Sequence, residues 1–269
     1  MFKVALIFIV CFFLSIVALN VAASEQDLQR FALVIGNKNY ASAPLKNAGN
    51  DANAMADNLS ELGFRVSLVE DANLSDLAVQ VQQFYAEIKA NKHKHKLALV
   101  YYAGHAIQVN HNNYIVPLGL QFDSHQQFIS GLYKVADLFT EINNIESLQS
   151  IIILDACRNN PFASNAIANN VNMSSGLAPI KAPSNTLIAF ATEPGGVAAD
   201  GKRKNGVYTK HLLRHMGKQI SVEEIFKKVR AGVAKETRNR QIPWEHSSLL
   251  NEVFFSPPKN KNIPDLVVF

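Results

Sequence analysis

The chain has 269 residues, of which 48% are hydrophobic, and a formal net charge of +4 at pH 7. This charge is spread thinly, and the densest basic run, residues 92–96, contains no aromatic residue on which a base could stack. A solvated turn explains that run better than a nucleic-acid surface, and its lysines would repel a metal ion held by the two histidines between them. We therefore expect neither a nucleic-acid partner nor a metal site.

The first two dozen residues have the pattern of an export signal. Lys3 gives a positive start, residues 4–19 are apolar or small, and residues 21–23 offer a cleavage site before Ser24 or Glu25. We expect residues 1–24 to be a signal peptide and the protein to be secreted or periplasmic. The alternative is an uncleaved membrane anchor, for which the apolar core is somewhat short.

The chain contains two cysteines, and the first, Cys11, lies inside the expected signal. The exported protein would therefore keep one thiol, Cys157, and could form no internal disulfide. A lone thiol in an oxidising compartment suggests either a reactive group or a buried inert one. The cysteine count leaves both interpretations open.

Short apolar runs alternate with stretches of helical periodicity along the rest of the chain. The runs predict strands at residues 31–35, 66–69, 97–102, 151–154 and 186–190, with a last strand at 252–256 closing the sheet edge. Helices are predicted at 51–62, 74–88 and 135–142, and two more follow the fifth strand, the second beginning with a capping box of Ser221 and Glu224. Apolar strands separated by helices predict an α/β fold in three layers, with a mainly parallel sheet of about six strands.

Binding and catalytic sites of such sheets lie at the carboxyl ends of the strands. His105 follows the third predicted strand and Cys157 follows the fourth. An imidazole beside a thiol raises the thiolate fraction and can later protonate a leaving amine, so the two residues are candidates for a catalytic pair. The alternative is structural, with His105 capping a strand end and Cys157 packed as a small apolar residue.

Several linked motifs resemble those of the caspase-fold peptidases. They are Tyr-Tyr-Ala-Gly-His at 101–105, Asp-Ala-Cys-Arg at 155–158, Ala-Leu-Val-Ile-Gly-Asn at 32–37 and Asn-Asp at 50–51. The set is more similar to metacaspases and bacterial caspase homologues than to animal caspases, whose signature has Gln at the place of Asp155. The resemblance extends over roughly residues 30–255.

The resemblance implies that Cys157 is the nucleophile and that His105 acts as base and then as acid. It also implies an oxyanion hole made by the backbone N–H groups of Ala106 and Cys157. The family usually has glycine at the place of Ala106. Because alanine resists a positive φ, a requirement for that angle would leave the site strained or slow.

The resemblance further implies a substrate pocket. Asp51 and Asp155 would line it and would favour Arg or Lys before the cut, although Asp51 also stands where an N-cap belongs. Residues 191–200, with Ala198 and Asp200, resemble the stretch that pairs with the substrate backbone, and Asp200 stands where animal caspases carry an Arg.

Residues 25–256 are expected to form the peptidase domain, and 257–269 an extended tail. Residues 161–185 show little pattern and suggest a linker, in which Lys181 is the basic residue available for self-cleavage. Trp244 is expected to pack rather than to contact substrate.

A second class of function stays open, a catalytically weak or inactive caspase-fold module that binds peptides. Some metacaspases require calcium, but the sequence shows no compact loop of oxygen ligands for it. The expected partners are protein or peptide substrates, a membrane only through an uncleaved signal, and a monomer rather than a dimer.

Overall fold

The computed structural model describes residues 28–156, 161–162, 165–169, 171–174, 176–198, 201 and 203–257. The expected signal peptide, Cys157, Asp200 and nearly all of the expected tail lie outside these ranges. Among the described residues, no helix combines the length and the apolar character needed to cross a bilayer.

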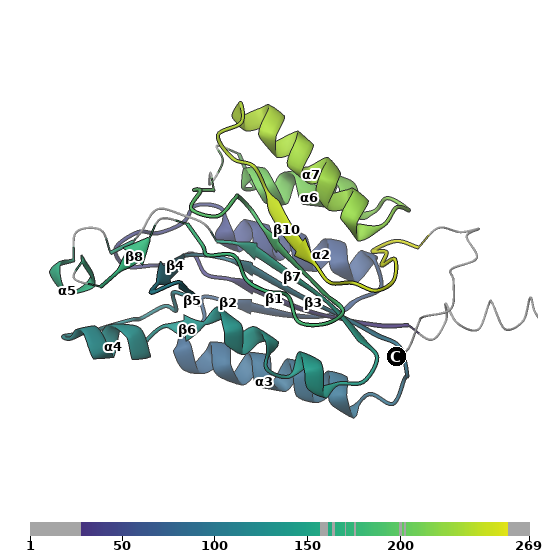
Figure 1. Ribbon diagram of the computed structural model, residues 1–269, viewed down its shortest axis with the longest axis horizontal. Coiled ribbons are helices and arrows are strands. Elements are labelled where there is room, and N and C mark those ends of the chain that lie inside the picture. The colour runs from purple at the N-terminus through teal and green to yellow at the C-terminus, as the bar shows by residue number, and fades with distance from the viewer. Residues whose placement is uncertain are drawn as a thin grey trace, which may run out of the picture.

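A six-stranded sheet forms the centre of the molecule (Figure 1). Its strand order is β10-β9-β7-β3-β1-β2, and every neighbouring pair is parallel except β9 with β10. β3 and β7 are buried along their whole length, because helices cover both faces of the sheet. The predicted α/β architecture is confirmed. The bounds are β1 Gln29–Gly36, β2 Arg65–Glu70, β3 Lys96–Ala103, β7 Leu148–Asp155, β9 Thr186–Phe190 and β10 Trp244–Ser247.

Helices α6 and α7 pack together over one face of the sheet, and α3 lies on the other (Figure 1). α2 packs against both β1 and α6. At the N-cap of α7 the Ser221 side chain accepts the backbone N–H of Glu224 at 3.4 Å, which is one of the two hydrogen bonds of the predicted capping box. The bounds are α2 Ala48–Glu61, α3 Leu74–Ala90, α6 Val207–Met216 and α7 Val222–Thr237.

The predicted helix at 135–142 is instead two short 3-10 helices, η1 Val135–Phe139 and η2 Ile142–Asn144. Its buried residues are Val135, Leu138, Phe139 and Ile142, and the spacings from Val135 to Leu138 and from Leu138 to Ile142 are three and four positions. Such spacing suits three residues per turn as well as 3.6, so the apolar pattern did not distinguish the two helix types.

A second, four-stranded sheet of order β6-β5-β4-β8 follows directly on His105 and was not predicted. It comprises β4 Ala106–Val109, β5 Asn112–Ile115, β6 Tyr133–Lys134 and β8 Met173–Ser174, and two short helices lie beside it, α4 His125–Ser130 and α5 Ala166–Asn169. Asn110 and His111 turn the β4–β5 hairpin with φ of 48° and 62°, as a two-residue hairpin loop requires. His105 therefore lies at the junction of the two sheets.

Two details of the sequence interpretation need correction. The edge strand is β10, not residues 252–256, because Val253 and Phe255 are buried without sheet pairing and the Val253 carbonyl instead accepts the N–H of Val222. The expected linker 161–185 contributes α5, β8 and the buried Leu177. Trp244 packs as expected, with its ring centroid 6.1 Å from that of Phe190.

Candidate functional site

The two strands that precede the expected catalytic pair are neighbours. β3 and β7 run parallel, with Ala103 opposite Asp155 at their carboxyl ends. Beyond the sheet the contact continues, because the N–H of Ala106 donates to the carbonyl oxygen of Ala156 at 3.2 Å. The structure thus brings His105 to the point where β7 leads into Cys157. Cys157 itself lies outside the described residues, so its distance from His105 stays a prediction.

The imidazole of His105 is buried, with 4% of the residue exposed, and its tautomer follows from its partner. Nε2 lies 2.7 Å from the carbonyl oxygen of Ala43. A carbonyl only accepts, so Nε2 carries the proton, and Nδ1 of the neutral ring holds the lone pair. Nδ1 is therefore the atom of His105 that can take a proton.

Ala106 has an unstrained backbone. It is the first residue of β4 and is absent from the described residues with positive φ, so alanine costs nothing at this position in this conformation. Its N–H, however, already donates to Ala156. An oxyanion would have to share or replace that bond, and the oxyanion role of Ala106 stays a prediction.

The two expected pocket carboxylates each accept hydrogen bonds from residues at the N-terminal end of α6. Asp51, with 0% exposed, accepts the N–H of Gly206 at 3.0 Å and the side-chain amide of Asn205 at 2.9 Å. Asp155, with 1% exposed, accepts the hydroxyl of Thr209 at 2.7 Å. The alternative of Asp51 as a cap of its own helix is wrong, since Asn47 is the N-cap of α2 and Asp51 instead binds the N-cap residue of α6.

Ala198 is described and buried, whereas Asp200 lies outside the described residues. Nearby, Glu193 is held by hydrogen bonds. Burial raises the pKa of its carboxyl, but the hydroxyl of Thr192 and the N–H of Ile242 donate to it and lower that pKa below its ordinary value overall. Lys181 is exposed.

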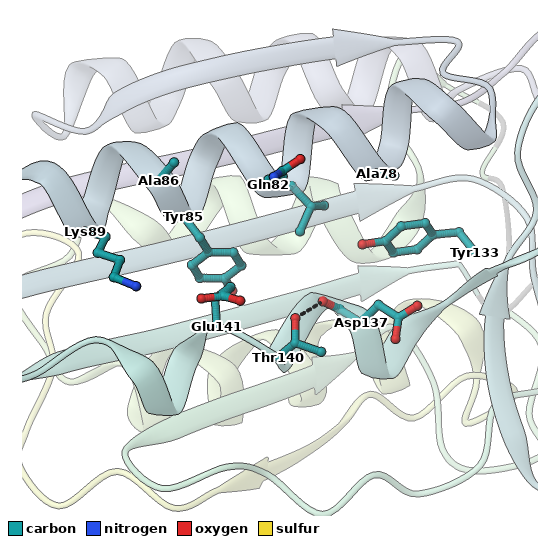
Figure 2. Close-up of a pocket in the computed structure, with 10 residues that line it drawn as sticks. Ala78, Gln82, Tyr85, Ala86, Lys89, Tyr133, Asp137, Thr140 and Glu141 are labelled. Atoms are coloured by element: carbon teal, nitrogen blue, oxygen red, sulfur yellow. Dashed lines mark hydrogen bonds between the residues drawn. The ribbon is translucent and has the colours of Figure 1, made fainter.

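A pocket of about 540 Å³ lies between α3 and η1. Figure 2 shows Tyr85, Tyr133, Asp137 and Glu141 around it. Its lining includes none of the expected catalytic or substrate-binding residues, and α3 covers the face of the sheet opposite α6 (Figure 1).

Sequence reasoning missed the groups that hold the expected site residues: the carbonyl of Ala43, the hydroxyls of Tyr40, Tyr102 and Thr209, and the amide of Asn205. The rule that pointed to the ends of β3 and β7 applies equally to β1, whose carboxyl end leads to Tyr40 and Ala43. That signal was available in the sequence.

Comparison with known families agrees with this arrangement. A family model of the caspase domain, peptidase family C14, matches residues 29–255. The match spans the six-stranded sheet, the helices on both of its faces and the carboxyl-end edge that carries His105. The chain therefore belongs to the caspase-domain family of cysteine peptidases.

Proposed function

We propose that this protein is an exported endopeptidase that uses Cys157 as nucleophile and His105 as general base and cleaves after Arg or Lys. The observation that carries the proposal is the hydrogen bond from Nε2 of His105 to Ala43, at the strand edge from which β7 leads to Cys157. It leaves Nδ1 as the atom that would accept the thiol proton of Cys157 in the proposed pair.

In the proposed reaction, Nδ1 of His105 takes the thiol proton and the thiolate attacks the carbonyl carbon of the scissile bond. The imidazolium then protonates the amine nitrogen as the C–N bond breaks, leaving a thioester on Cys157. A water molecule, deprotonated by the same imidazole, attacks the thioester and releases the carboxylate product and the thiol. The Ala43 carbonyl keeps the ring oriented through both proton transfers.

The preference for a basic side chain is proposed from Asp51 and Asp155. Both carboxylates are buried at the first turn of α6, where a buried negative charge is costly unless a cation or hydrogen bonds compensate it. The Asn205 amide that donates to Asp51 is half-buried and stands where a substrate guanidinium or ammonium would donate. A substrate Asp at the same place would be repelled.

The test is hydrolysis of fluorogenic peptides ending in Arg, Lys or Asp by the protein and by its Cys157→Ala and His105→Ala variants, with and without calcium. We expect cleavage after Arg or Lys that both substitutions abolish. Asp51→Asn and Asp155→Asn should each lower kcat/KM for the Arg peptide about 30-fold, which corresponds to about 2 kcal/mol for a buried charge pair. Cleavage only after Asp would refute the pocket.

A second candidate function is a peptide-binding module without turnover, favoured by the commitment of the Ala106 N–H to Ala156. The same peptides decide between the two. Saturable binding of the Arg peptide without release of product, in wild type and Cys157→Ala alike, would support the module.

Self-processing after Lys181 stays part of the proposal, supported by the exposure of that side chain. If it occurs there, Lys181→Ala should remain one chain under conditions in which the wild type yields two. The same two fragments from the variant would end the idea.

Export stays part of the proposal as well. We expect the mature protein outside the cytoplasmic membrane with its N-terminus at Ser24 or Glu25, which N-terminal sequencing of the purified protein would test. An intact N-terminus in the membrane fraction would identify the anchor instead.

A further inference from the structure

Two tyrosine hydroxyls bracket the backbone of His105. The hydroxyl of Tyr40 accepts the N–H of His105 at 3.0 Å, and the hydroxyl of Tyr102 donates to the carbonyl oxygen of His105 at 2.8 Å. The two hydroxyls are 3.1 Å apart. Both tyrosines are buried, Tyr40 with 8% exposed and Tyr102 with 0%. The peptide groups on both sides of this histidine are thus held by side chains from two different segments.

The two carbonyl acceptors account for both hydroxyl protons. Each phenol has a single proton to donate. That of Tyr102 goes to the His105 carbonyl, and that of Tyr40 goes to the carbonyl oxygen of Val116 at 3.0 Å. Either hydroxyl can donate in the contact between the two tyrosines. Tyr40 therefore ties His105 to the start of the loop after β5.

Tyr40 also contacts the ring itself. Its ring centroid lies 4.5 Å from that of His105, with the planes inclined at 62°. This edge contact, the Nε2–H bond to Ala43 and the two backbone anchors restrain the imidazole from different directions. Burial raises the pKa of Tyr40 to about 12, so the phenol keeps its proton throughout the pH range of peptidase assays.

Gly104 makes room for this arrangement. A Cβ at position 104 would lie 2.3 Å from the hydroxyl oxygen of Tyr102 and 2.9 Å from that of Tyr40. Its backbone has no positive φ, so space rather than conformation demands glycine here. The glycine that precedes His105 in the chain is thus explained by the two hydroxyls.

We propose that Tyr40 and Tyr102 are positioning residues for His105, and that Gly104 is required because it admits their hydroxyls. The proposal rests on the proposed role of His105 as general base. Neither phenol takes part in bond making. They fix where Nδ1 points, and a misplacement of about 1 Å in such a group can cost about 100-fold in rate.

The first test is kinetic, on the full chain with the peptide that the wild type cleaves. Tyr40→Phe keeps the ring and removes the hydroxyl, so kcat should fall about 10- to 100-fold with KM within about twofold. Tyr85→Phe is the matched control, since its hydroxyl also bonds a backbone carbonyl, that of Leu138 at 2.8 Å, but on α3 across the sheet. The control should keep wild-type kcat.

Gly104→Ala should reproduce the loss with both tyrosines unsubstituted, because its Cβ would displace their hydroxyls. Its control is Gly217→Ala, where a Cβ would meet nothing within 4 Å and φ is −74°. If Tyr40→Phe does not fold, Tyr102→Phe, which removes the donor to the His105 carbonyl, replaces it. Wild-type kcat in the folded hydroxyl variants would overturn the proposal.

The second test does not need activity. In protein labelled with ¹⁵N-histidine, the signals that disappear in His105→Gln identify the His105 imidazole. The wild type should show Nε2 protonated and Nδ1 not, whereas Tyr40→Phe should shift the two signals toward each other as the tautomers mix. A wild type that cleaves no peptide refutes the proposed function. The tautomer signals then test whether Tyr40 positions the His105 ring, and unchanged signals in Tyr40→Phe would overturn that positioning role.

Discussion

Removal of one hydroxyl at the start of α6 should reveal how strongly the fold depends on the charge of Asp155. The Thr209 hydroxyl donates to Oδ2 of Asp155 at 2.7 Å and lies 2.6 Å from the hydroxyl of Tyr101. Thr209 is 0% exposed and Asp155 1%. Valine keeps the shape of threonine, so Thr209→Val removes the two contacts without leaving a cavity.

The expected cost follows from the charge and burial of the partner. A hydrogen bond to a charged group contributes about 1.5–3 kcal/mol, and a bond between neutral groups about 0.5–1.5 kcal/mol. We expect Thr209→Val to lower the free energy of unfolding by about 2 kcal/mol, or the melting temperature by about 4–8 °C for a domain of this size. Thr186→Val is the control, because the buried Thr186 hydroxyl donates to a neutral carbonyl, that of Ser184, at 3.2 Å. It should cost less than 1.5 kcal/mol, as for about one neutral bond.

Urea unfolding of wild type, Thr209→Val, Asp155→Asn and the double variant gives the coupling between the two side chains. We expect a coupling energy of about 1–2 kcal/mol. A coupling near zero, with Thr209→Val no worse than Thr186→Val, would show that the buried Asp155 carboxylate does not depend on this donor.

Other consequences concern packing and pH. Gly36→Ala should destabilise the protein by about 1–3 kcal/mol in the same urea assay. The added Cβ would lie 2.5 Å from the Cβ of Ala52, where β1 meets α2. An unchanged free energy of unfolding would mean that α2 moves away at no cost. Hydrogen bonds from Lys210 and then from His211 hold the pKa of Glu236 below its ordinary value, so its contribution to stability is present above about pH 4.5 and is lost as the pH falls through the lowered value. The stability difference between wild type and Glu236→Gln should therefore shrink below pH 4.5, and a difference that is flat from pH 7 to pH 3 would contradict this assignment.

The parallel part of the large sheet could be predicted because its central strands are largely apolar. β3 and β7 are buried on both faces and therefore appear as unbroken apolar runs, and such runs followed by helices allow few arrangements other than a parallel sheet. The same rule placed His105 at a carboxyl end beside β7. The fold class and the site's edge follow from local pattern alone.

The small sheet gave no comparable signal. Its strands have two to four residues, and β5, Asn112–Ile115, begins with two asparagines. β8 pairs with β4 across more than sixty residues, so only the tertiary structure establishes that contact. The edge strand β10, which contains Glu245 and His246, is partly exposed, whereas β3 is buried on both faces. Its exposed positions carry polar residues, so β10 lacks the apolar run by which β3 was recognised.

The polar contacts of the site were the hardest feature to predict from the sequence. The sequence suggested Asp51 and Asp155 only through resemblance, and nothing local indicated that both would meet α6, whose Gly206 lies 155 residues after Asp51. Ala43 contributes only a backbone carbonyl, which any residue could supply.

The proposed function requires that Cys157 is a nucleophile and that His105 activates it. Its most direct test is covalent trapping, with peptidyl ketone probes ending in Arg or Asp and with peptide mapping of the labelled protein by mass spectrometry. We expect a single adduct, on Cys157, formed with the Arg probe and slowed at least about 100-fold in His105→Ala, within the range for loss of a general base. An unlabelled Cys157 with every probe, or equal labelling in His105→Ala, would contradict it.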